Sequence, residues 1–219
     1  MQMDIEIITE KTIGFVKEKL AGAETGHDWF HIERVYKNAL GIYAIEQGDL
    51  LVVTLSALLH DIADSKFNNG DEEIGPRIAG VFMQELNISE EVMLHVQQII
   101  RNLSYKASLG QLTFHSKELD IVQDADRLDA IGAIGIARAF TYGGYKNRVM
   151  YDPEISPDMN MSKDAYKNSV APTINHFYEK LLRLKDLMKT AAGKKLAEKR
   201  HKFMLDYLNE FFSEWEGKN

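Results

Sequence analysis

One apolar segment limits the folds that are open to this chain. Residues 50–64 read LLVVTLSALLHDIAD, and the first charged residue in this segment is Asp61. A helix that is apolar on nearly all sides must be covered by other elements on several sides. The segment therefore predicts a central helix in a multi-helix protein, with His60 and Asp61 close to its end.

The rest of the chain also has a helical pattern. Apolar residues recur at spacings of three and four in several long segments, whereas alternating apolar and polar runs are almost absent. The helices expected from this pattern span residues 4–20, 28–47, 71–86, 89–102 and 118–140, and two more share residues 164–216, with a break near Ala191–Gly193. Residues 141–163 are rich in Gly, Pro, Asn and Asp and predict a long loop. The predicted fold class is all-α.

The composition excludes several classes of protein. A net charge of −7 and a pI of about 5.5 give no general attraction to nucleic-acid phosphates, so nucleic-acid binding is not expected, although a small anionic substrate is compatible. The chain has no cysteine, which excludes disulfides and thiolate zinc sites. No segment offers the ~20 apolar residues that cross a bilayer, and the first residues lack the apolar core of a signal peptide. We therefore expect a cytoplasmic protein without a membrane partner.

The pair His60–Asp61 is the first candidate for chemistry. Burial of a carboxylate beside an imidazole costs several kcal/mol unless a partner compensates for it. A divalent metal ion is one such partner, and neighbouring residues near the end of a helix are able to approach one ion from different directions. We therefore expect both side chains at a metal site.

A second pair of histidines precedes this helix. His27 and His31 are four residues apart, so they are able to share one helical face and chelate a metal together. The alternative is that His27 or Asp28 caps the helix while only His31 points inward, one turn later. We favour His31 as the metal ligand.

Three carboxylates occur within six positions of a third apolar segment. In DADRLDAIGAIG, which begins at residue 124, Asp126 and Asp129 share a helical face and Asp124 points elsewhere. Structural ion pairs with Arg127 or Arg138 would account for one or two of these carboxylates but not readily for all three. Histidine and carboxylate ligands together suit a borderline or hard divalent ion.

The ordered set His31, His60–Asp61 and Asp126 resembles the H…HD…D signature of HD-domain phosphohydrolases. The flanking patterns HDxxHxxRV and DADRLDAIGAIGIAR are similar to a bacterial subgroup of predicted HD hydrolases. This resemblance covers about residues 24–185. It implies an HD-type helical bundle in which His31, His60, Asp61 and Asp126 bind the metal, with His27, Asp124 and Asp129 around them. The C-terminal helices at about 164–216 are expected to pack on this core as an extension, so that residues 1–219 form one domain.

The resemblance also implies a mechanism. In relatives that hydrolyse nucleotides, an acidic residue four positions after the histidine of the HD pair helps to activate water, and that position is Asp64 here. Cationic side chains are needed to hold the phosphates, and the candidates are Lys66, Arg127, Lys146 and Arg148. The loop Tyr142–Tyr151 either closes over a base or sugar or serves as a packed connector.

The expected activity is hydrolysis of a phosphoester or phosphoanhydride bond in a nucleotide or a related small phosphate. One divalent ion is expected, with manganese first and magnesium, cobalt, nickel, zinc or iron as alternatives. His95 and His115 lie between the HD pair and the last aspartate but do not match the two-metal pattern. Two other functions stay open, an HD-type di-iron oxygenase and a non-catalytic regulatory protein stabilised by its metal. The long C-terminal helices are compatible with a homodimer.

Overall fold

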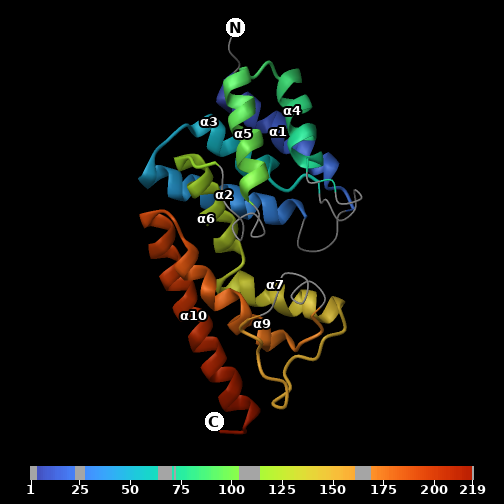
Figure 1. Cartoon of the computed structure of the whole chain (residues 1–219), viewed down its shortest axis with the longest axis vertical. Helices are drawn as coiled ribbons and strands as arrows, with labels where there is room; N and C mark the ends of the chain where they lie inside the picture. The colour runs from blue at the N-terminus through green and yellow to red at the C-terminus, as the bar shows by residue number, and fades with distance from the viewer. Residues whose placement is uncertain are drawn as a thin grey trace. The chain divides into compact units, whose positions relative to one another are not determined.

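A computed structural model describes residues 4–22, 28–63, 71, 73–103, 114–160 and 169–218 of the chain. The described residues form helices joined by turns and loops and contain no β-strand, which confirms the all-α prediction (Figure 1). The chain divides into two compact units, Met1–Asp126 and Arg127–Asn219. None of the described helices is long and apolar enough to cross a membrane.

The first unit is built around its most apolar helix. Its helices are α1 (Ile5–Lys19), α2 (Trp29–Glu46), α3 (Leu50–Leu59), α4 (Ile74–Glu85), α5 (Glu90–Leu103) and most of α6 (Lys117–Asp129). Helix α3 packs against α1, α2 and α5, and every residue from Val52 to Leu59 is buried. The prediction of a central helix is confirmed. The helix ends at Leu59, earlier than predicted. The prediction was too long because Ile62, in the turn that follows, is also buried, so the apolar pattern continues past the end of the helix.

Aspartates begin the two helices that lead to the histidines. Asp28 is the N-cap of α2, and its Oδ1 accepts a hydrogen bond of 2.9 Å from the backbone N–H of His31. Asp49 is the N-cap of α3 and accepts from Leu51 and Val52. Each carboxylate satisfies N–H groups that lack a partner within the first turn of the helix. The sequence left the cap of this helix open between His27 and Asp28, and Asp28 is the N-cap.

The second unit contains α7 (Gly132–Tyr145), α9 (Thr173–Glu179), the 3-10 helix η3 (Leu181–Leu187) and α10 (Ala191–Trp215). The single helix predicted over 118–140 is wrong, because α6 ends at Asp129 and α7 starts at Gly132. Gly132 has φ 76°, a backbone conformation that interrupts a right-handed helix. The loop predicted from residue 141 begins only after Tyr145, because α7 continues through two further glycines.

The C-terminal helices differ from prediction in their boundary. Residues Ala191–Gly193 form the first turn of α10 rather than a break, and the hydroxyl of Thr190 accepts a hydrogen bond from the backbone N–H of Gly193. The break lies just before, at residues 188–190. Helix α10 packs on α7 and η3 within its unit.

Candidate metal centre

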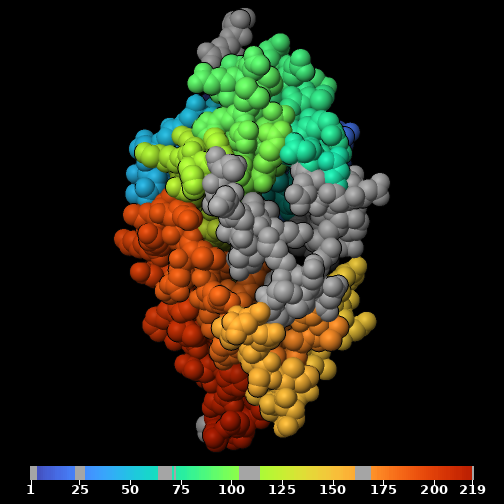
Figure 2. Space-filling model, viewed as in Figure 1, coloured from blue at the N-terminus to red at the C-terminus, as the bar shows by residue number. Residues whose placement is uncertain are grey.

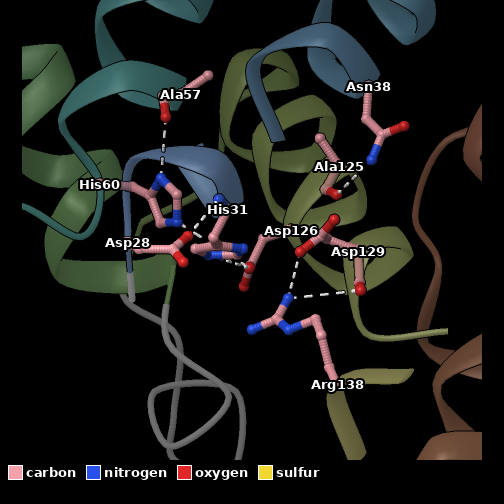
Figure 3. Close-up of polar contacts among 9 residues, drawn as sticks. All are labelled: Asp28, His31, Asn38, Ala57, His60, Ala125, Asp126, Asp129 and Arg138. Carbon is pink, nitrogen blue, oxygen red and sulfur yellow. Dashed lines mark hydrogen bonds and ion pairs between the residues drawn. The ribbon is translucent and has the colours of Figure 1, made fainter. Parts of the chain in front are cut away.

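Three predicted ligands meet in the first unit. His31 comes from α2, His60 follows the last residue of α3, and Asp126 lies on α6. One ligand atom from each of the three lies within 4.8 Å of the others. The Nε2 atom of His31 is 3.6 Å from Oδ1 of Asp126, and the Nε2 atom of His60 is 4.0 Å from the same oxygen (Figure 3). Residues that are 95 positions apart in the sequence thus form one cluster of two imidazoles and a carboxylate.

His60 has the surroundings of a ligand rather than of a satisfied core residue. Its Nδ1 lies 2.9 Å from the carbonyl oxygen of Ala57 and donates to it, so the proton of a neutral ring is on Nδ1. Its Nε2 is buried, and no donor or acceptor among the described residues forms a hydrogen bond with it. The unprotonated Nε2 is therefore directed toward the cluster, where a cation would satisfy it.

Burial also keeps this ring neutral. Burial lowers the pKa of His60 below its ordinary value and outweighs the charges of Asp126 and Asp61, which act in the opposite direction. A neutral imidazole is the form that binds metals. The charge state of His60 therefore fits metal binding at neutral pH.

The other two ligands are held by contacts along their helices. His31 is only 3% exposed, and its ring meets that of His60 edge-on with 5.4 Å between the ring centres. A second contact joins the two helices that carry His31 and Asp126. The side-chain amide of Asn38 on α2 donates to the carbonyl oxygen of Ala125 on α6. This bond links the helix that carries His31 to the residue beside Asp126. Nothing in the local sequence pattern marks Asn38, because its partner Ala125 lies far along the chain.

Asp61 is placed differently from the other three predicted ligands. Its side chain is half-buried, and its charge acts on His60. The group of mutually close ligand atoms found among the described residues contains His31, His60 and Asp126, and does not include Asp61. The role of Asp61 as a fourth ligand stays a prediction.

The aspartates on either side of Asp126 are both fully buried. Asp129 forms an ion pair with Arg138 on α7, and Arg138 also donates to the backbone carbonyl of Asp129 (Figure 3). This is one of the structural ion pairs that the sequence allowed. The predicted supporting roles of Asp124 and Asp129 around the metal stay predictions, and His27 lies outside the described residues.

The predicted catalytic base Asp64 and the predicted phosphate ligand Lys66 also lie outside the described residues. Arg127 is described and is only 6% exposed. Its guanidinium donates to the backbone carbonyl of Leu187, so part of its hydrogen-bonding capacity is used within the second unit. Its role in phosphate binding stays a prediction.

Lys146 and Arg148 follow the end of α7. The ammonium of Lys146 lies 4.8 Å from the ring centre of Tyr145, and the guanidinium of Arg148 lies 5.5 Å from that of Tyr142. Arg148 also donates to the backbone carbonyl of Ser169. Cations stacked on tyrosine rings combine positive charge with an aromatic surface.

The two remaining histidines between the HD pair and Asp126 do not build a second group. The Nε2 atom of His95 lies 2.9 Å from the hydroxyl of Ser116 and 3.6 Å from Oε2 of Glu118, and His115 is exposed. Among the described residues, only the cluster above brings three or more histidine or carboxylate ligands together. The prediction of a single metal is compatible with this arrangement.

The chain is similar to proteins of one family along nearly its whole length. A family model described as HD domain matches residues 29–131. An HD-superfamily hydrolase of Bacillus thuringiensis is 45% identical, with 97% of this chain and 99% of that chain covered and a TM-score of 0.79. A structure from Lactobacillus plantarum is 34% identical, with 98% and 100% covered and a TM-score of 0.83. YpgQ of Bacillus subtilis, solved in complex with ADP, is 35% identical, with 97% of each chain covered and a TM-score of 0.76.

These similarities agree with the site itself. The family model spans α2, α3 and α6, which are the elements that contribute the three clustered ligands. Two histidines and an aspartate suit a divalent metal ion, and the unsatisfied Nε2 of His60 fits one. The chain therefore belongs to the HD superfamily and is a metal-dependent hydrolase of this phosphohydrolase family.

Proposed function

We propose that this hydrolase cleaves a phosphoanhydride or phosphoester bond of a nucleotide, with one divalent ion, manganese first, bound by His31, His60, Asp61 and Asp126. The observation that carries the proposal is the cluster of two imidazoles and one carboxylate with a buried Nε2 that lacks a hydrogen-bond partner among the described residues. A buried ring nitrogen without a hydrogen-bond partner is unfavourable by itself, because burial removes it from water.

When bound, the ion would polarise a phosphoryl oxygen and lower the pKa of a water molecule. The residues of the chain orient the metal ligands, supply negative charge and accept the proton from water. The hydrogen bond from Nδ1 of His60 to Ala57 fixes the ring orientation and leaves Nε2 available. Asp126 brings negative charge, and 35% of its side chain is exposed. We assign proton acceptance from water to Asp64, on the basis of its position in the sequence.

Two observations support a nucleotide as the substrate class. The structure of YpgQ contains ADP, and this relative covers nearly the whole chain. The second unit carries cations next to aromatic rings, with Lys146 over Tyr145 and Arg148 over Tyr142. We propose that these two cations, together with Lys66 and Arg127, bind the phosphates.

A phosphate-release screen tests the proposal. Purified protein is incubated with nucleoside mono-, di- and triphosphates and with Mn²⁺, Mg²⁺, Co²⁺ or Ni²⁺, and orthophosphate and pyrophosphate are measured separately. We expect turnover with at least one nucleotide, strongest with Mn²⁺. Asp126→Asn should abolish it, whereas Glu90→Gln, an exposed acidic position on α5, should not.

The outcome of this screen separates the parts of the proposal. Absence of turnover for every nucleotide and ion would contradict the proposed substrate class. Full activity of Asp126→Asn would contradict the proposed site. For Asp64→Asn we expect retained metal binding and lost turnover, and loss of the metal would make Asp64 a ligand instead. Tightly bound iron together with oxygen consumption would favour the oxygenase alternative.

A further inference from the structure

Side chains from two later helices hold the C-terminal end of α6. The last four carbonyl groups of an α-helix have no partner within the helix, and α6 ends at Asp129. The guanidinium of Arg200 on α10 donates to the carbonyl oxygen of Leu128, and that of Arg138 on α7 donates to the carbonyl oxygen of Asp129. All four residues belong to the second unit. Two arginines therefore bind carbonyl groups at the open end of this helix.

The charges at this helix end favour the same arrangement. The C-terminus of a helix is the negative end of its dipole, where cationic side chains are stabilising. Asp129 is only 1% exposed and forms an ion pair with Arg138. Burial lowers the pKa of Arg200, and the charge of Asp129 opposes this effect. One buried carboxylate therefore supports both guanidinium groups as charged donors.

Gly132 leaves the space that the stem of Arg200 occupies. A Cβ atom at position 132 would lie 3.0 Å from the Cβ and Cγ atoms of Arg200, which is closer than such atoms normally approach. Helix α10 packs on α7, and its outer face, coloured from orange to red, lies at the surface in Figure 2. The packing of α10 and the missing side chain at Gly132 together determine where the stem of Arg200 runs.

Asp126 lies in the last turn of α6, between two sets of hydrogen bonds. Before it in the chain, the carbonyl oxygen of Ala125 accepts from Asn38 on α2 (Figure 3). After it, the carbonyl oxygens of Leu128 and Asp129 accept from the two arginines. The direction of a helical side chain follows from the backbone of its turn. Opening of the last turn would therefore move the carboxylate of Asp126 away from the two histidines of the cluster.

We propose that Arg200 is a positioning residue for the metal site. Its bond to the carbonyl oxygen of Leu128 keeps the last turn of α6 helical, and this turn holds the carboxylate of Asp126 in the direction that metal binding requires. The inference rests on the proposed function, because it takes Asp126 as a metal ligand. Arg200 is a better probe of this role than Arg138, because Arg138 also neutralises the buried carboxylate of Asp129.

Metal affinity is the first test. Arg200→Met keeps an apolar stem beside Gly132 and removes the donors. We expect its affinity for Mn²⁺, measured by isothermal titration calorimetry on metal-free protein, to fall by about tenfold, the lower end of the range for residues that support metal ligands. Arg200→Lys keeps the charge and a donor but lacks the planar fork of the guanidinium, so its affinity should lie between those of wild type and Arg200→Met.

A second arginine of the same unit provides the control. Arg183 on η3 donates to the carbonyl oxygens of Met159 and of Glu179, the last residue of α9. Arg183→Met therefore removes an arginine from the end of a helix that carries none of the clustered ligands, and it should bind Mn²⁺ as wild type does. Urea unfolding of each variant checks that it is folded under the conditions of the titration.

Hydrogen exchange of the metal-free protein tests the cause. In Arg200→Met, the amides of residues 117–131 should exchange faster than in wild type, because the end of α6 has lost a carbonyl partner. In Arg183→Met they should exchange at the wild-type rate. A loss of metal affinity in Arg200→Met without faster exchange in this segment would overturn the positioning role.

Asp126→Asn separates this inference from the proposed function. If Asp126→Asn binds Mn²⁺ as wild type does, Asp126 is not a ligand and both proposals fail. If Asp126→Asn loses the metal while Arg200→Met binds it normally, only the positioning role fails. Equal losses of affinity in Arg200→Met and Arg183→Met would also overturn it, because general destabilisation would then explain both. If Arg200→Met does not fold, Arg200→Gln, whose amide ends short of the guanidinium, takes its place with the same expected results.

Discussion

The Nε2 atom of His60 lies 4.0 Å from Oδ1 of Asp126, while Nδ1 of the same ring is held by the carbonyl oxygen of Ala57. The imidazole is thus oriented from behind by its own helix and directed toward a carboxylate from another helix. No hydrogen-bond partner for Nε2 occurs among the described residues. A divalent cation would satisfy both the Nε2 atom of His60 and the carboxylate of Asp126 at once.

His60→Gln should therefore remove metal affinity without unfolding the protein. We expect the affinity for Mn²⁺, measured by isothermal titration calorimetry, to fall by more than about tenfold, since even indirect partners of metal ligands contribute that much. His115→Gln, at an exposed histidine, is the control and should bind as wild type does. Equal affinities for the two variants would exclude His60 as a ligand.

Asp28→Ala should lower both stability and metal affinity. Loss of this N-cap costs about 0.5–2 kcal/mol, and it also releases the first turn of α2, which positions His31. Thr190→Ala removes the N-cap of α10 in the second unit and should cost similar stability without any change in metal affinity. Urea denaturation and calorimetry measure the two effects. If Asp28→Ala binds metal normally, the cap does not position the site.

Arg138→Met should destabilise the protein strongly. Asp129 is buried, with 2% of its side chain exposed, and Arg138 neutralises it. Breaking a buried pair in this way costs about 3 kcal/mol, because a carboxylate remains without its partner. Asp129→Asn should recover part of the loss when it is combined with Arg138→Met. A double-mutant cycle in urea measures the coupling, and additive effects would show that the pair is not coupled.

Gly132→Ala should also be destabilising. Gly132 has φ 76°, and a Cβ there would lie 3.0 Å from the Cβ and Cγ atoms of Arg200. The left-handed conformation alone costs an alanine about 1–2 kcal/mol. Gly41→Ala is the opposite case, since Gly41 lies inside α2 and its added Cβ would meet no atom within 4 Å among the described residues. That substitution should gain about 0.5–1 kcal/mol, so thermal unfolding should shift the two variants in opposite directions.

His176 should make stability depend on pH. Burial lowers the pKa of His176 to about 3, and the charges of Lys180 and Arg148 act in the same direction. Below about pH 6.5 the unfolded chain binds a proton at this histidine, whereas the folded protein does so only near pH 3. Its contribution therefore lowers the free energy of unfolding as the pH falls from about 6.5 toward 3, by up to about 1.4 kcal/mol per pH unit.

The substitution His176→Gln should remove this part of the slope. Free energies of unfolding measured in urea between pH 7 and pH 5 should fall less steeply for the variant than for wild type. His115→Gln should keep the wild-type slope, because that side chain is exposed. Identical slopes for wild type and His176→Gln would show that His176 is not held neutral by the fold.

Local pattern was sufficient for much of the fold. The run from Leu50 to Leu59 has so few polar residues that only a helix covered on several sides accommodates it, and α3 is such a helix. The positions of His27 and Asp28 before an amphipathic segment indicated a cap at one of the two, and Asp28 is the N-cap. The break between α6 and α7 could not be read in this way, because Gly132 lies in a stretch whose other residues are all compatible with a continuous helix.

The sequence by itself determined the helical class, the order of the candidate ligands and the absence of cysteine chemistry, since these depend on residue types and their spacing along the chain. Only the tertiary structure decided that His31, His60 and Asp126 meet while Asp129 pairs with Arg138. The reason is physical. Neighbours on one helix share a pattern, but side chains on different helices are brought together by packing, and packing alone decides which carboxylate faces a histidine and which faces an arginine.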